Sequence, residues 1–120
     1  MISGITTFNG IEASVSGING GRVVQVVAAG NIANVHSQDY QAARVDLSSV
    51  ATGGVSASVS ISDDPPLEFY NPDGSKTTFS NVDLVTEITS MKMGELMVNA
   101  NAAAYKIQAD SIGTILDTFG

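Results

Sequence analysis

The C-terminal third of the chain carries the most regular hydrophobic pattern in the sequence. From residue 84 onward, steps of four and three residues meet an apolar side chain at every position except Glu95. The stripe consists of Leu84, Ile88, Met91, Glu95, Val98, Ala102, Tyr105, Ala109, Ile112, Leu116 and Phe119. This spacing is typical of the contact seam of a coiled coil. It predicts a C-terminal helix about 55 Å long.

We expect this helix to begin at "SNVD", residues 80–83. The side chain of Ser80 or Asn81 can accept a hydrogen bond from the free backbone N–H groups of a first helical turn. Asp83 places a negative charge near the positive end of the helix dipole. The segment therefore contains the residue types that favour a helix start.

The N-terminal stretch repeats the four-three spacing with two polar interruptions. Its stripe consists of Phe8, Ile11, Val15, Ile18, Arg22, Gln25, Ala29 and Ile32. Val23 and Val27, with Val24 and Val26, point in other directions, and a helix that is apolar on several sides needs more than one neighbour. Six glycines lie in the same stretch, and each costs roughly 1 kcal/mol relative to alanine inside a helix. We therefore expect this helix to depend on assembly for its stability.

Between the two helical patterns the sequence alternates as strands do. In "VSASVSISD" serines alternate with the apolar residues Val55, Ala57, Val59 and Ile61. The preceding "RVDLSSV" alternates more loosely, and "ATGG" between them is a turn signal, so the two segments predict a β-hairpin. Prolines at 65 and 66 end regular pairing, and "NPDG" predicts another turn with proline at its second position.

These patterns predict an α+β, mainly α fold in which two long terminal helices form a coiled-coil hairpin. A small middle domain containing the β-hairpin separates them. We place the N-terminal helix in residues 1–36, the middle domain in residues 37–80 and the C-terminal coiled-coil helix in residues 81–120.

The stretch "NIANVHSQDY", residues 31–40, lies where the first helix is expected to end. Asn31 and Asn34 are one helical turn apart, close to carbonyl groups that need donors. His36 lies where a partly charged imidazole favours the helix end. Asp39 falls at a tight turn where a positive φ is often needed, which Asp tolerates better than most residues. We expect both asparagines to hold the helix end or to contact a neighbouring subunit.

Charge and composition exclude several partners. Five Lys and Arg residues against twelve Asp and Glu residues give a net charge of −7, which is the wrong sign for binding nucleic acid or an anionic membrane surface. The most apolar patch, "VVQVVAAG", is too short to span a bilayer. The start of the chain lacks the basic region and apolar run of a cleaved signal peptide. The chain has no cysteine, which excludes disulfides and thiolate metal sites.

The sequence also contains no constellation that indicates an enzyme or a small-molecule site. Ser37 and Asp39 flank the single histidine, but adjacency does not supply the geometry of a Ser-His-Asp triad. Asp63 and Asp64 are the only adjacent carboxylates, and they lack the ligand spacing of a zinc or calcium site. We therefore expect no catalytic residue, no metal, no cofactor and no small-molecule substrate.

Three segments resemble the rod and hook proteins of the bacterial flagellum. "NIANVHSQDYQAARV" is similar to the motif that closes the N-terminal helix of that family. "SNVDLVTEITSM" and "ANAAAYKIQADSIGTILD" are similar to its C-terminal helix. The middle segment "GGVSASVSISDDPPLEFYNPDG" is similar in order to the short domain of the FlgC-type proximal rod proteins. The resemblance covers nearly the whole chain.

This resemblance implies a structural subunit of the flagellar basal-body rod, which polymerises through its paired terminal helices into an axial tube that spans the periplasm. It also implies export by the flagellar secretion apparatus without a cleaved signal, and contacts with other rod proteins. The alternative is a secreted helical-hairpin adaptor or effector that acts as a soluble dimer. Such a dimer would not need valines on the extra faces of the first helix.

The residues expected to form the assembly surfaces belong to the two helical patterns and to the end of the first helix. They are Ile11, Val15, Ile18, Arg22, Val23, Val27, Asn31, Asn34, Leu84, Ile88, Met91, Glu95, Val98, Tyr105, Ala109, Ile112 and Leu116. If the helices pair antiparallel, Arg22 falls opposite position 94, within one residue of Glu95, and both charged residues interrupt an otherwise apolar stripe. A paired charge in a seam can fix its register, so we expect the two side chains to meet within a subunit or between neighbours.

Overall fold

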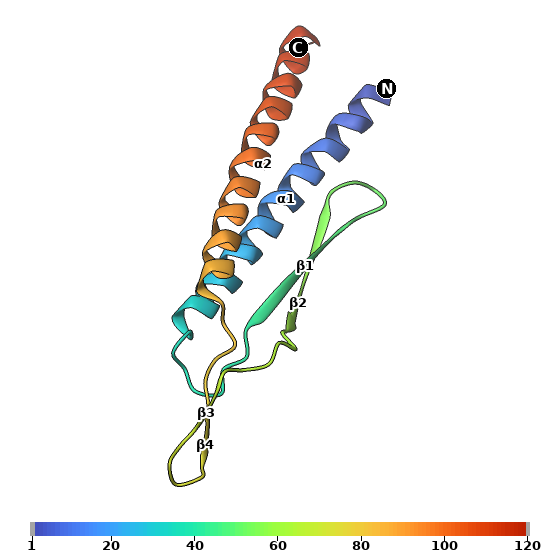
Figure 1. The fold of residues 1–120 in the computed structure, drawn as a ribbon. Helices are drawn as coiled ribbons and strands as arrows, with labels where there is room; N and C mark the ends of the chain where they lie inside the picture. The colour runs from blue at the N-terminus through green and yellow to red at the C-terminus, as the bar shows by residue number, and fades with distance from the viewer. Residues whose placement is uncertain (1, 120) are drawn as a thin grey trace.

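The computed structural model describes the backbone of residues 2–119 and the side chains of residues 10–119. Its elements are α1 (Ile2–Ala33), β1 (Ala43–Ser49), β2 (Val55–Ile61), β3 (Glu68–Tyr70), β4 (Lys76–Thr78) and α2 (Leu84–Phe119). The helices run antiparallel and side by side, so the start of α1 and the end of α2 lie at the same end of the molecule (Figure 1). The molecule is elongated, with extents of 80 × 23 × 15 Å. The predicted α+β, mainly α fold with its long C-terminal helix is confirmed.

The start of α2 is capped by a different residue from the two expected. Asp83 Oδ1 accepts from the backbone N–H groups of Val85 at 3.1 Å and Thr86 at 3.4 Å. Asn81 instead accepts from the N–H of Ala42, and the Ser80 hydroxyl donates to the carbonyl of Val35. The cap prediction was therefore wrong for Ser80 and Asn81, because both are engaged by the chain that follows α1.

The two helices contact each other through a stripe of small and polar side chains. On α1 this stripe consists of Gly10, Ser14, Gly17 and Gly21, and it meets Gly94, Met97, Val98, Asn101 and Gln108 of α2. At Gly21 backbone meets backbone, since an added Cβ there would lie 2.8 Å from the carbonyl oxygen of Gly94. A side chain at either glycine would force the backbones apart. The helices can therefore lie this close only because neither residue has a Cβ.

The predicted β1–β2 hairpin is confirmed, with Val45 paired to Val59 and Leu47 paired to Ala57 in an antiparallel register. It packs along α1, where the N–H of Val55 donates to the Ser16 hydroxyl at 3.1 Å. Gly54 sits against Ser16 with a φ of 91°, so the turn needs glycine both for its conformation and for space. The hairpin therefore covers the face of α1 next to the one that α2 covers.

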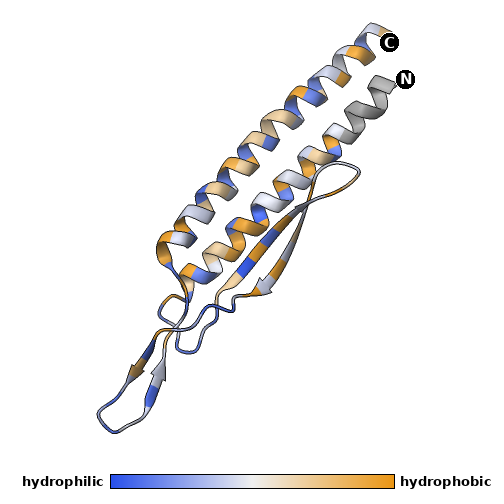
Figure 2. Cartoon of the chain, turned by 45° about the vertical axis from the view of Figure 1, so that its right-hand side comes forward, coloured by the Kyte–Doolittle hydropathy of each residue, from blue (hydrophilic) through white to orange (hydrophobic). Residues whose placement is uncertain are grey.

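A second hairpin, β3–β4, extends past the helix ends at the opposite end of the molecule from the start of α1 (Figure 1). Its strands have three residues each, and the predicted "NPDG" turn joins them, with the N–H of Gly74 donating to the carbonyl of Asn71 at 2.9 Å. The sequence did not predict these strands, because three residues beside two prolines carry no alternation. Figure 2 shows apolar residues recurring along both helices and through the strands.

Candidate functional site

Asn31 joins the end of α1 to the start of β1. Its side chain is 1% exposed, and its Nδ2 donates to the carbonyl of Ala43 at 2.8 Å. Its Oδ1 accepts from the N–H of Ala43 and from the Tyr40 hydroxyl, both at 2.9 Å. The amide therefore pairs with Ala43 much as a neighbouring strand would. Holding the helix end is one of the two roles expected for Asn31.

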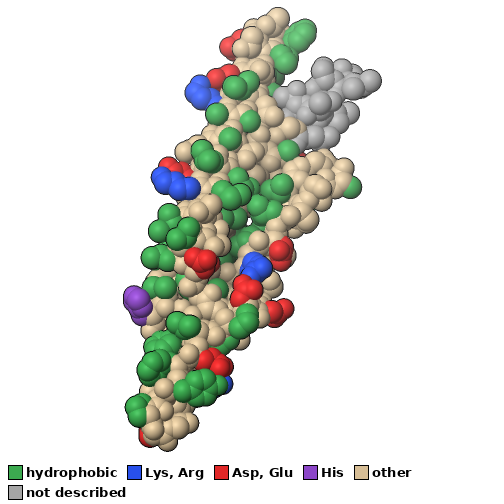
Figure 3. Space-filling model, in the orientation of Figure 1, with side chains coloured by type: hydrophobic (Ala, Val, Ile, Leu, Met, Phe, Trp, Pro, Cys, Tyr) green, Lys and Arg blue, Asp and Glu red, His purple; other side chains and the backbone are tan. Residues whose placement is uncertain are grey.

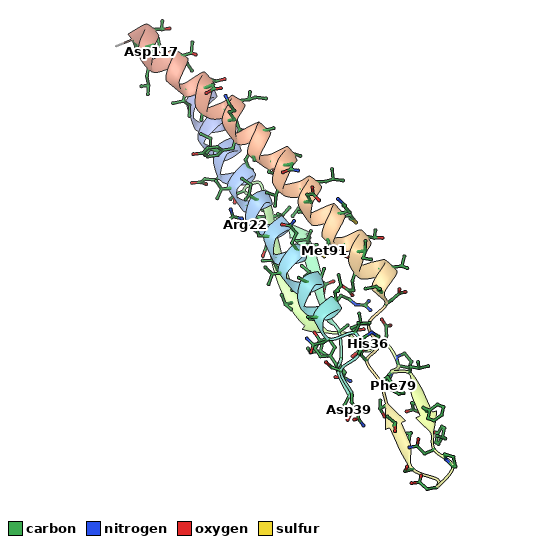
Figure 4. The ribbon with its side chains drawn as sticks, turned by 90° about the vertical axis from the view of Figure 1, so that its left-hand side faces the viewer. Arg22, His36, Asp39, Phe79, Met91 and Asp117 are labelled. Atoms are coloured by element: carbon green, nitrogen blue, oxygen red, sulfur yellow. The ribbon has the colours of Figure 1, made fainter. Side chains whose placement is uncertain are left out.

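The Asn34 side chain bonds to the backbone of the last turn of α1. Its Nδ2 donates to the carbonyl of Gly30 at 2.9 Å, and its Oδ1 accepts from the Ser37 hydroxyl at 3.0 Å. Asp39 has a φ of 60°, which confirms the positive value expected there. His36 is exposed, and Figure 4 places it with Asp39 in the connection that follows α1. The Ser37 hydroxyl thus donates to Asn34, and residues 31–40 form a hydrogen-bonded connection at the end of α1.

The large apolar stripe of α2 is only partly buried within the chain, and Val98 is its member that lies next to Gly21. Leu84, Ile88, Tyr105 and Leu116 are 44%, 50%, 42% and 64% exposed. Met91, Val98, Ala109 and Ile112 are half-buried. The stripe that the sequence indicated as a seam therefore lies at the edge of the intramolecular contact, because the glycines bring a neighbouring face of each helix together.

The apolar and charged residues of α1 that were expected at assembly surfaces also differ in burial. Val15 is 40% exposed, Arg22 is exposed, and Ile11, Ile18, Val23 and Val27 are half-buried. Phe8 lies outside the described side chains. The buried positions are instead Ser14, Gly17, Gly20, Gly21, Ala28 and Asn31. Small residues at four-three spacing were the signal in the sequence that could have identified this contact face.

Arg22 and Glu95 do not form an ion pair within the chain. The described ion pairs are Arg44–Asp64, Lys76–Glu68, Lys92–Glu95 and Lys106–Asp110. Glu95 is therefore paired with Lys92 on the same helix. Arg22 projects from α1 away from α2 (Figure 4). The intramolecular form of the predicted contact was wrong, because the glycine contact turns both side chains outward. The intermolecular form remains a prediction.

A groove of about 600 Å³ lies between α1, β1 and the first half of α2. Its apolar lining includes Val24, Val27, Leu47, Met93 and Met97. Charged residues at its edge are Arg44, Asp64, Asp83 and Glu87. Figure 3 shows the hollow between α2 and the β1–β2 hairpin, with apolar side chains inside and charged ones around it. No pattern in the sequence predicts this groove, since it forms only where three separate elements meet.

The β3–β4 end carries a cluster of exposed large side chains. Leu67, Phe69 and Tyr70 are 69%, 56% and 67% exposed, and Figure 3 shows apolar side chains gathered at this end. Lys76 donates to Glu68 at 2.8 Å. This hydrogen bond, with the charge of the ammonium, lowers the pKa of Glu68 and raises that of Lys76. The hairpin is therefore a surface with apolar and charged groups side by side.

Among the side chains of residues 10–119, no three His, Asp or Glu residues come close enough to hold a metal ion. Neither described helix has an apolar run of the length needed to cross a bilayer. The described buried side-chain nitrogen and oxygen atoms all have hydrogen-bond partners. The candidate functional features of the described residues are therefore the groove and the exposed apolar surfaces, which could contact another chain.

Comparison with protein-family models and with curated proteins finds no match to this sequence. The geometry of the exposed surfaces and the resemblance of the helix motifs are therefore the basis for a functional proposal.

Proposed function

We propose that this chain is a structural subunit that polymerises through its paired terminal helices, as part of the rod of the bacterial flagellar basal body. The observation that carries the proposal is the distribution of apolar side chains. Ala28 and Ala42 are the only apolar side chains buried among those described, whereas twenty large apolar side chains are exposed. Exposed apolar surface on this scale is typical of a protein that is completed by contacts with other chains.

The position of these side chains supports assembly over ligand binding. They follow α2 along its whole length and continue over both hairpins, with Leu96 and Ile107 of α2 each 67% exposed, and α1 adds Val15 and Val26, the latter 70% exposed. A ligand site gathers its apolar groups in one concave region. Side chains spread along an 80 Å molecule instead favour lateral packing of many copies, as in a tube. The partners of the proposal are further copies and other rod proteins, and its location is the periplasmic span of the basal body.

Sedimentation and electron microscopy of the purified protein test self-assembly. The average mass should rise with protein concentration, and images should show tubes or filaments. Burial of the exposed apolar residues provides the driving force, so assembly should weaken on cooling. A compact dimer whose mass does not change with concentration would instead support the adaptor alternative.

A second measurement tests the cellular assignment. The chain carrying a small internal epitope tag in the exposed turn at residues 51–54 should be found in purified basal bodies, at a position between the inner and outer membranes. The turn is exposed except for Gly54, so an epitope inserted after Thr52 leaves the contact between Gly54 and α1 in place. Basal bodies that lack the tagged chain, in cells that express it, would contradict the rod assignment and leave self-assembly standing.

A further inference from the structure

Two surfaces on opposite sides of α1 have complementary chemistry. One is the groove, whose floor includes Val24, Val27 and Ala28 of α1. The other is a ridge of α1 residues that neither α2 nor the hairpin covers, and it consists of Glu12, Val15, Asn19, Arg22, Val26 and Ala29. The helical period of 3.6 residues puts the ridge on the side of α1 away from the groove. Each molecule thus carries one convex and one concave surface.

The two surfaces match in polarity. The ridge exposes Val26 to 70% and Val15 to 40%, while the groove is lined by valine, leucine and methionine side chains. Met93 and Met97 are unbranched and flexible, so they can adapt to an inserted helix face. Apolar side chains of the ridge would find apolar partners inside the groove.

The two surfaces also match in charge. All five Lys and Arg residues of the chain have described side chains, and Arg22 is the one without an ion-pair partner among them. At the groove, Arg44 is paired with Asp64 and Asp83 caps α2, whereas Glu87 is half-buried and outside the described ion pairs. An unpaired cation at the centre of the ridge therefore has a counterpart in the groove of another copy.

We propose that the ridge of one copy docks into the groove of the next, with Arg22 pairing with Glu87. This inference rests on the proposed self-assembly and specifies its contact. Because the two surfaces differ and lie on opposite sides of α1, the contact is heterologous, and repeating it yields an open helical chain, or a ring where the rotation between copies closes, instead of a two-fold dimer. Arg22 would then interrupt the apolar stripe of α1 because it is the charged group that sets the register.

Crosslinking tests the contact directly, since the chain has no cysteine of its own. Single variants Val26→Cys and Ser90→Cys place one thiol on the ridge and one at the groove. Under mild oxidation, a mixture of the two should give crosslinked dimers about tenfold more abundant than either variant alone, as expected for a strongly preferred contact. A chain with both changes should give a ladder of crosslinked oligomers.

The distribution of products separates this inference from the proposed function. If the wild-type protein polymerises but the mixture gives no excess of crosslinked dimers, the ridge-to-groove contact is wrong and self-assembly stands. Equally abundant dimers from Val26→Cys alone would indicate a symmetric back-to-back contact, such as Arg22 with Glu95 of a second copy, and would overturn the inference. If the wild-type protein stays monomeric at all concentrations, both proposals fall together.

Charge reversal gives an independent test. Arg22→Glu and Glu87→Arg should each raise the critical concentration for assembly about tenfold or more, because each places like charges together. Mixing the two variants should restore assembly, since an alternating polymer brings opposite charges together at every contact. Lys106→Glu is the matched control, because it makes the same charge change at an exposed helix position away from both surfaces. An equal loss in the control, or no restoration on mixing, would overturn the proposed pair.

Discussion

The junction and the shaft of this molecule are stabilised in different ways. The junction, residues 31–43 with residues 80–83, places Asn31 and Ser80 in buried positions where each makes side-chain hydrogen bonds to the backbone. The shaft, formed by α1 and α2, pairs through glycines and leaves most of its large apolar side chains outside. The junction is therefore complete in a single chain, whereas the shaft has surface left for further contacts.

The two regions therefore differ in whether their stabilising contacts lie within one chain or between chains. A hydrogen bond in the junction contributes within the chain, because both partners belong to it. An apolar side chain on the shaft contributes only when another surface removes it from water. Substitutions in the junction should thus change the stability of the monomer, and substitutions on the outside of the shaft should change assembly.

The largest effect on the monomer is expected from Asn31→Ala. The change leaves the N–H and carbonyl of Ala43 and the Tyr40 hydroxyl without their partner, so the free energy of unfolding should fall by about 3 kcal/mol. Denaturant titration under monomeric conditions measures it. Asn19→Ala is the control, since Asn19 is exposed on the same helix. If both changes have the same small effect, the junction is not the stabilising region described above.

A smaller effect is expected at Gly94, where the backbones of the two helices meet. A Cβ at residue 94 would lie 2.8 Å from the carbonyl oxygen of Gly21 and 2.7 Å from Gln25 Cγ, so Gly94→Ala should destabilise by about 1 kcal/mol, after the gain in helix propensity is subtracted. Gly113→Ala has nothing within 4 Å of its added Cβ and should stabilise by about 0.5–1 kcal/mol. Thermal unfolding of both variants gives the comparison. The same sign for both would show that close packing at residue 94 is unimportant.

On the outer surface of the shaft, a substitution should change assembly without changing the stability of the monomer. Leu96 is 67% exposed, so Leu96→Gln should change the free energy of unfolding by less than about 0.5 kcal/mol. The same change should reduce polymer formation, measured by sedimentation at a fixed protein concentration. Thr89→Gln, at an exposed polar position of the same helix, should leave both properties unchanged. A large loss of monomer stability in Leu96→Gln would mean that this side chain belongs to the core of the single chain.

The smallest effect concerns the β3–β4 hairpin. Lys76→Met removes the hydrogen bond and the charge that lower the pKa of Glu68, so that pKa should rise toward its usual value, as an NMR titration of the carboxyl would show. Because the folded-state pKa is lowered, the pair stabilises the hairpin above the usual pKa of a glutamate, and this contribution disappears as the pH falls through the lowered value. An unchanged Glu68 pKa in the variant would mean that the pair does not form in solution.

Much of the fold followed from patterns that depend on neighbouring residues alone. The serine alternation through Val55 and Ile61 identified β2, the four-three stripe identified α2, and the tight turn after α1 gave the positive φ of Asp39. Each of these signals arises from a local periodicity or a local backbone preference. Local patterns were therefore sufficient for the elements and for the turn.

Local patterns could not predict the face through which α1 and α2 contact each other, nor the groove. Two stripes run along α1 at the same four-three spacing, one of large apolar residues and one of small residues, and periodicity does not distinguish which of them faces the other helix. The glycines of α1 lower its helix propensity, but Gly21 and Gly94 also let the two helix backbones meet. The positions of the groove and the ridge depend on which stripe of α1 faces α2. They could therefore be recognised only from the three-dimensional arrangement of the helices.

The distances along the sequence between contacting residues indicate an order of folding. Asn31 meets Ala43 twelve residues away and Ser16 meets Val55 across 39 residues, whereas Ser14 meets Gln108 across 94. Closing a longer loop costs more chain entropy, and distant contacts form more slowly. Since synthesis proceeds from the N-terminus, α1 and the β1–β2 hairpin can dock before α2 has been made. The glycine-lined face of α1 is then the last surface to be covered as the chain completes its fold.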